Sequence, residues 1–172
     1  KAGPGNSGIV DIQKESELSG NIHDKAGLTI QGYMNSKYAR EFPLSLNGSI
    51  SFEQVYSMVE GDSASVAETV AFLSAIAEAP IKQSIAVTGS INQSGRVQPV
   101  GGVQFKVEGF YELCKLKGLN GKQGVVIPDT NFDNLVLPDE IVLAIKNGRF
   151  NIWTVETVDE AIELLTGLKA GQ

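Results

Sequence analysis

The chain has 172 residues, of which 42% are apolar and 20% are charged. This balance fits one domain with its own core and excludes a disordered or fibrous chain. The net charge of −6 argues against a general affinity for nucleic acid or for an anionic membrane surface. The single cysteine, Cys114, excludes an intrachain disulfide and fits a reducing compartment, so we expect a cytoplasmic protein. No uninterrupted apolar stretch approaches membrane-spanning length, so we expect no membrane segment.

The first half of the chain mixes strand-like and helix-like patterns. In chain order, the expected elements are a loop at 1–8, a short strand at 9–13, a helix at 21–40, a half-buried strand at 44–55 and a helix at 63–79. The last helix is the clearest of these, because apolar residues recur at spacings of three and four from Val66 to Ala77. Pro80 then ends the pattern.

Strands alternate with helices through the second half. We expect strands at 84–91, 95–100, 123–128 and 150–155, and helices at 101–117, 138–148 and 157–167. Thr157 and Glu160 have the spacing of a capping box at the start of the last helix. This alternation predicts a compact, two-layer α/β domain, although it does not fix the order of the strands.

The segment "GDSAS" at 61–65 precedes the helix that is predicted at 63–79. Ser65 and Glu68 have capping-box spacing, and Asp62 or Ser63 is also a suitable cap, so local sequence alone favours a cap. A nucleophilic serine is the alternative. The unpaired N–H groups and partial positive charge of a helix N-terminus can hold an oxyanion, and Ser63 is placed to use them.

A nucleophilic serine needs a base, and the chain offers two candidates. His23, the only histidine, lies in the polar segment "GNIHDK", where a surface or capping role is expected. Lys106 lies at the edge of an apolar helical stripe, where desolvation would favour the neutral amine that acts as a base. The stripe consists of Val103, Val107, Phe110, Leu113 and Cys114. The pattern alone favours a bland alternative, in which Lys106 reaches over the stripe to water, as Lys117 does at the helix end.

Several motifs occur in an order that resembles the proteolytic domain of Lon proteases. They are "GDSAS" before an alanine-rich helix, then "AVTGSI", "GRVQPVGGVQFK" and "GVVIPDTN". "VEGDSAS" and the upstream "SGNIHDK" look closer to the archaeal-type and related bacterial Lon-like enzymes. The resemblance covers about residues 8–167. It implies one compact α/β proteolytic domain over 1–172, with loose ends at 1–7 and 168–172, excised from a longer chain that carries an ATPase module.

The resemblance also implies roles for individual residues. Ser63 matches the nucleophile of the family and Lys106 its general base. Thr88 matches a threonine that helps to orient the lysine amine, and Asp62 lies in the region of the oxyanion hole. Ser90 stands where the common bacterial pattern has glutamate, so no role is carried over to it.

The function implied by this resemblance is a serine endopeptidase with a Ser–Lys dyad that hydrolyses unfolded proteins within a homohexameric ring. ATP and magnesium would bind only to the ATPase module, or a separate unfoldase would supply that activity. No cofactor or metal is expected in this domain. A carboxylate beside the lysine favours the ammonium form, so we hypothesise an inactive state in which Asp62 pairs with Lys106.

Two other functions stay open. Small-molecule kinases of the galactokinase–homoserine kinase type also use a Gly/Ser loop at a helix N-terminus, there to bind ATP phosphates. Asp62 would repel phosphate, and the chain lacks their denser Gly-Ser-Ser run as well as a Walker-type motif. The third reading is an inactive structural subunit of a protease ring, against which the presence of both Ser63 and Lys106 argues.

Overall fold

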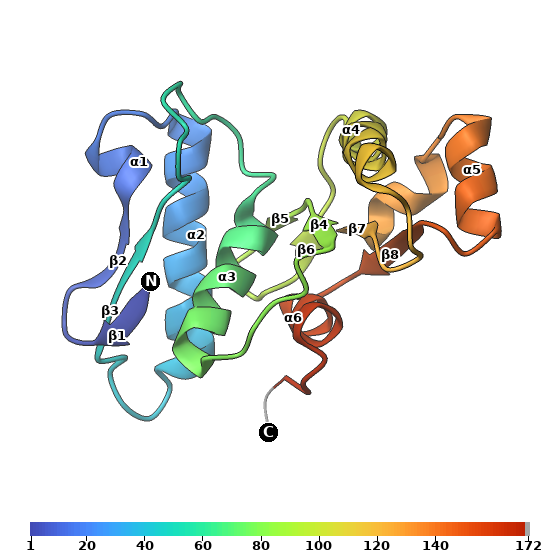
Figure 1. The fold of residues 1–172 in the computed structure, drawn as a ribbon. Coiled ribbons are helices and arrows are strands. Elements are labelled where there is room, and N and C mark those ends of the chain that lie inside the picture. The colour runs from blue at the N-terminus through green and yellow to red at the C-terminus, as the bar shows by residue number, and fades with distance from the viewer. Residues whose placement is uncertain (171–172) are drawn as a thin grey trace.

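A computed structural model describes residues 1–170, so the predicted looseness of 171–172 lies outside the described residues. Helices and strands alternate along the chain and confirm the α/β class (Figure 1). The strands are β1 (Ala2–Pro4), β2 (Gly8–Asp11), β3 (Leu46–Ile50), β4 (Ile85–Val87), β5 (Ser90–Ile91), β6 (Val97–Gln98), β7 (Gly124–Pro128) and β8 (Asn151–Val155). The helices are α1 (Ile12–Glu15), α2 (Asn21–Tyr38), α3 (Ser65–Ala77), α4 (Val103–Lys117), the 3-10 helix η1 (Asp129–Asn134), α5 (Asp139–Lys146) and α6 (Val158–Thr166).

The N-terminal part of the chain forms a three-stranded sheet in the order β1-β3-β2. The loop predicted for residues 1–8 is wrong at its start, because β1 pairs antiparallel with β3 and places Ala2 opposite Gly48. The strand predicted over 44–55 is correct only for its central part. Its partners β1 and β2 reach residues 46–50 alone, so the alternating pattern beyond Ile50 has no strand to pair with.

The second sheet is parallel, with the order β4-β7-β8. β7 is buried along its whole length, and its side chains alternate between two cores. Val126 packs in a core shared with α2, α3 and α6, whereas Val125 and Ile127 pack in a core shared with α4 and α5. Figure 1 accordingly shows α4 above and α6 below the β7–β8 pair.

The single strand predicted over 84–91 is two strands, because the chain leaves the sheet at Thr88 and Gly89. Thr88 N–H still donates to Val126 O of β7 at 3.0 Å, which anchors this break. The break turns the chain toward the N-terminus of α3, where Gly89 N–H donates to Ser63 O at 2.8 Å. It therefore brings "VTGS" beside "GDSAS".

The apolar stripe predicted for α4 is partly correct. Val103, Val107 and Cys114 are buried as predicted. Leu113 is instead 48% exposed, and Tyr111 is buried in its place. Residues 103, 107, 111 and 114 follow spacings of four and three, so they lie on one helical face, and position 113 falls outside it.

Candidate active site

The "GDSAS" segment forms a tight loop that leads into α3. Gly61 has a φ of 89°, a left-handed conformation that favours glycine. The capping box predicted for Ser65 and Glu68 is wrong. Ser65 Oγ donates to Asp62 O at 2.6 Å instead of accepting from Glu68, whose N–H donates to Ala64 O. Ser65 thus closes the loop on itself, and the loop holds Ser63 at its tip.

Three hydrogen bonds join this loop to the Thr88–Gly89 break. Gly89 N–H and Thr88 Oγ1–H both donate to Ser63 O, at 2.8 and 3.3 Å. Val66 N–H donates to Gly89 O at 3.1 Å. A Cβ at Gly89 would lie 2.9 Å from a Val66 methyl carbon, so glycine permits this close approach. The backbone of Ser63 is therefore fixed from a second segment of the chain.

Lys106, in the first turn of α4, reaches the same point. Its Nζ lies 2.8 Å from Ser63 Oγ and 3.0 Å from Thr88 Oγ1. The structure thus brings together Ser63, Thr88 and Lys106 from three different segments. The amine contacts two hydroxyl groups of the protein, whereas the snorkelling alternative would place it in water.

The environment of Lys106 favours the neutral amine. Desolvation lowers the pKa of Lys106, and the Asp62 carboxylate opposes this shift to a smaller extent. Lys106 as a whole residue is nevertheless exposed. The residue is therefore only partly withdrawn from solvent, while its amine contacts Ser63 and Thr88.

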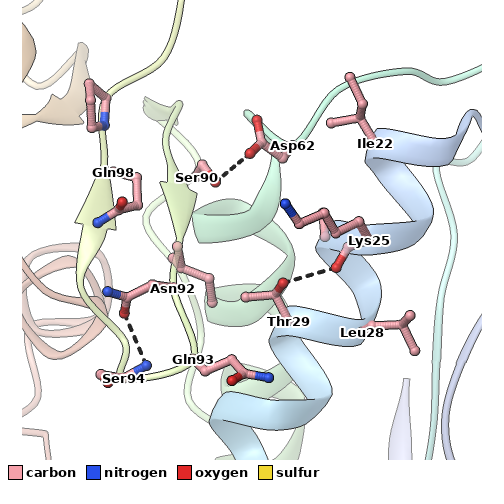
Figure 2. A pocket seen from close by; sticks show the side chains of 13 residues that line it. Ile22, Lys25, Leu28, Thr29, Asp62, Ser90, Asn92, Gln93, Ser94 and Gln98 are labelled. Carbon is pink, nitrogen blue, oxygen red and sulfur yellow. Dashed lines mark hydrogen bonds between the residues drawn. The ribbon is translucent and has the colours of Figure 1, made fainter.

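Asp62 makes its hydrogen bond with Ser90 and not with the lysine. Its Oδ2 accepts a hydrogen bond of 2.8 Å from Ser90 Oγ, which Figure 2 draws as a dashed line. Among residues 1–170 no ion pair joins Asp62 to Lys106, so the structure does not contain the inactive pairing that we hypothesised. Sequence reasoning missed Ser90 as the partner of Asp62. The hydroxyl directly after the Thr-Gly break was the available signal.

Two backbone donors remain at the start of α3. Within the described part of the chain, the N–H groups of Ser63 and Ala64 donate to no protein acceptor. They stand at the positive end of a thirteen-residue helix, where unpaired N–H groups attract negative charge. The site therefore combines a hydroxyl, a partly desolvated amine and free N–H donors.

Residues 56–167 match the family model for the Lon protease (S16) C-terminal proteolytic domain. This chain belongs to the Lon protease family. It is 46% identical to a Lon protease homolog from Escherichia coli, over 95% of this chain and 28% of that protein. A Lon protease homolog from Haemophilus influenzae is 44% identical, over 95% and 27%.

An archaeal Lon protease from Pyrococcus abyssi is 37% identical to this Lon-family chain, over 67% of the chain and 10% of that protein. The chain therefore spans little more than a quarter of its two bacterial relatives and a tenth of this archaeal one. The matched region of the family model begins at residue 56, so α2 and the N-terminal sheet lie outside it.

A groove of about 850 Å³ opens beside the Lon-type loop, between α2 and the β5–β6 hairpin (Figure 2). Asp62 and Ser90 form its end nearest to the dyad, while Ser63 and Lys106 do not line it. Ile22 and Leu28 contribute apolar surface from α2, and the hairpin contributes mainly amide and hydroxyl groups.

His23 does not have the surface position that the sequence suggested. The expected surface position is wrong, because His23 is only 1% exposed. Its Nε2 lies 2.9 Å from Asp11 Oδ2 and its Nδ1 lies 3.8 Å from Glu68 Oε1. The signal was present in α2, where His23 shares one helical face with the buried residues Ala26 and Ile30.

Residues 1–170 offer neither a metal-binding cluster nor a membrane-spanning helix. No group of three or more His, Cys, Asp and Glu side chains is arranged to hold a metal ion. None of the helices in this part of the chain combines the length and apolar character that crossing a membrane requires.

Proposed function

We propose that this chain is a serine endopeptidase that hydrolyses peptide bonds of unfolded proteins with Ser63 as nucleophile and Lys106 as general base. The observation that supports it most strongly is the distance of 2.8 Å between Lys106 Nζ and Ser63 Oγ. The lowered pKa of Lys106 supports it as well, because only a neutral amine can take the serine proton.

In the first step, the lysine amine contacts the hydroxyl groups of both Thr88 and Ser63. An N–H of neutral Lys106 donates to Thr88 Oγ1 and leaves its lone pair for the hydroxyl proton of Ser63. Ser63 Oγ then attacks the peptide carbonyl carbon. The N–H groups of Ser63 and Ala64 are suited to bind the oxyanion that forms.

In the second step, the Lys106 ammonium returns its proton to the departing amine, and an acyl-enzyme on Ser63 remains. A water molecule then gives a proton to neutral Lys106 and attacks the acyl carbonyl. When the ester breaks, the proton passes back to Ser63 Oγ and the free enzyme is restored. This cycle needs no cofactor or metal in the domain.

We place this activity within a larger protein. The bacterial relatives are more than three times as long as the matched segment, which leaves room for an ATPase module that would bind ATP and magnesium. Such a module would unfold substrates and feed them to a ring of proteolytic domains. The single cysteine, Cys114, fits operation in the cytoplasm.

A direct assay tests the proposed function. The chain is incubated with a chemically unfolded protein, with the same protein folded, and with a fluorogenic peptide, and its oligomeric state is measured on the same sample by light scattering. We expect cleavage of the unfolded protein and the peptide by an assembled ring. Cleavage that survives in Ser63→Ala would contradict the proposal, as would ATP hydrolysis by the chain itself.

A further inference from the structure

Three elements meet in a buried polar cluster that the proposed reaction does not use. It consists of Asp11, which caps the first turn of α1, His23 of α2 and Glu68 of α3. His23 is 1% exposed and Glu68 6%. The imidazole lies between the two carboxylates, 2.9 Å from Asp11 Oδ2 and 3.8 Å from Glu68 Oε1.

The burial of these three polar side chains between helices is energetically unfavourable. Buried ionisable groups destabilise a fold unless each is paired, and well-packed apolar residues are often at least as stabilising. Among the described residues, Glu68 Oε1 and His23 Nε2 are both buried without a hydrogen bond, although Nε2 lies close to Asp11 Oδ2. Burial and the nearby Asp11 raise the pKa of Glu68 to about 7, against the opposing effect of His23. Stability alone therefore does not account for these three side chains.

The N-terminal end of α2 also holds the segment that precedes the nucleophile loop. Gly20 N–H donates to Val59 O at 2.9 Å, and Val59 N–H donates to Leu18 O at 2.8 Å. Ile22 N–H donates to Glu60 Oε1 at 3.2 Å. Residues 59–60 are thereby tied to the start of α2.

The cluster also contacts the segment that follows the nucleophile loop. Glu68 lies in the first turns of α3, and its N–H donates to Ala64 O at 2.9 Å. His23 reaches Glu68 from the same end of α2 that binds Val59 and Glu60. One end of one helix thus holds the chain both before and after residues 61–64.

We propose that His23 is a positioning residue, which acts through Glu68 and Asp11 to hold the nucleophile loop in register with Lys106. This inference rests on the proposed function, because it assigns a support to Ser63. The support comes from α2 and the β2–α1 junction, both of which precede the region that matches the family model. The imidazole contacts carboxylates of two other elements, so it restrains α3 relative to α2 and with it the direction of Ser63 Oγ.

The test compares His23→Leu, which keeps bulk without polarity, with His23→Gln, which keeps a donor for the carboxylates. Ile30→Val is the matched control, since Ile30 is also 1% exposed on α2 but packs only in the apolar core. We expect His23→Leu to lower kcat about 10- to 100-fold, with KM within about three-fold, because small misplacements of reacting groups have effects of this size. His23→Gln should recover most of the loss, and Ile30→Val should lower only the melting temperature.

Hydrogen–deuterium exchange gives a second measurement that does not depend on activity. In His23→Leu, amides of residues 59–68 should exchange faster, while those of 103–117 should stay as in the wild type. Glu68→Gln serves in the same way if His23→Leu does not fold. Wild-type kcat in a folded His23→Leu, or unchanged exchange over 59–68, would overturn the inference and leave the dyad standing. An inactive wild type would instead count against the proposed function, and exchange would still decide the role of His23.

Discussion

Two polar clusters lie on either side of the first turns of α3, and they differ in their exposure to solvent. Ser63, Thr88 and Lys106 form a partly exposed cluster in which each hydroxyl contacts the amine. In the second cluster, His23 and Glu68 are buried and Asp11 is partly exposed, and one Glu68 carboxylate oxygen has no hydrogen-bond partner among the described residues. The first faces α4 and the second faces α2.

The difference shows how the N-terminus of one helix can hold a candidate dyad on one side and a buried cluster that positions it on the other. Partial desolvation is enough to lower the pKa of Lys106, while the access to solvent that remains leaves room for a substrate and for water. In the other cluster, burial and the nearby Asp11 raise the pKa of Glu68 to about 7, against the opposing effect of His23, so its charge is sensitive to its neighbours. An exposed dyad and a buried support are therefore expected to respond differently to substitution and to pH.

Removal of either member of the dyad should have the largest effect. We expect Ser63→Ala and Lys106→Ala each to lower kcat by about a thousand-fold or more, because groups that act as a unit fail together. Lys117→Ala, at the other end of α4, is the matched control and should keep wild-type activity. Peptidase assays on folded protein measure this. Equal residual activity in all four proteins would disprove the dyad.

Removal of the Thr88 hydroxyl should have the next largest effect. Thr88→Val keeps the shape of the side chain but leaves an N–H of Lys106 without its acceptor. We expect kcat to fall about 10- to 100-fold, since the amine loses its orientation. Thr88→Ser should retain most of the activity. A Thr88→Val enzyme as fast as the wild type would show that Thr88 only packs.

The buried cluster should make the free energy of unfolding depend on pH. The pKa of Glu68 is raised from 4.5 to about 7, so the folded state binds this proton more tightly than the unfolded state. The resulting stabilisation is fully present below about pH 4.5 and is lost as the pH rises through about 7. Its size is on the order of 1–3 kcal/mol.

Urea unfolding at about pH 5 and about pH 8 measures this change. Glu68→Gln should remove that part of the change, because its amide carries no titrating proton. If wild type and Glu68→Gln lose the same stability between the two pH values, the buried carboxyl is not the source.

The smallest effect should come from Asp62, whose charge only opposes the dominant desolvation of Lys106. Asp62→Asn keeps an oxygen that can accept from Ser90 but removes the carboxylate. The pKa of Lys106 should fall further, so the neutral base should persist to lower pH. We expect the acidic limb of the kcat profile to move to lower pH. An unchanged limb, or one moved to higher pH, would show that Asp62 does not act on Lys106.

The elements that sequence predicted best are those specified locally. The apolar spacing of α3, the continuous apolar run of β7 and the Thr157 cap of α6 are all short-range signals. Pairing between segments that are distant in the chain could not be predicted from such short-range signals. The contact of Ala2 with Gly48 and the break of the strand at Thr88 depend on partners elsewhere in the chain.

The candidate site shows the same division. The ordered motifs pointed to Ser63, Thr88 and Lys106, and the structure places Lys106 Nζ within hydrogen-bonding distance of the hydroxyl groups of the other two. Whether they perform the assigned roles stays a prediction. The Asp62–Ser90 contact and the burial of His23 were missed, because polar residues are buried only where remote segments supply partners.

A fluorophosphonate labelling experiment tests the central claim most directly, since this reagent phosphonylates only an activated serine. Peptide mass analysis locates the adduct, in the wild type, in Lys106→Ala and in Lys117→Ala. The account predicts one adduct on Ser63 in the wild type and in Lys117→Ala, and none in Lys106→Ala. An adduct on another serine, or equal labelling of Ser63 without Lys106, would contradict the account.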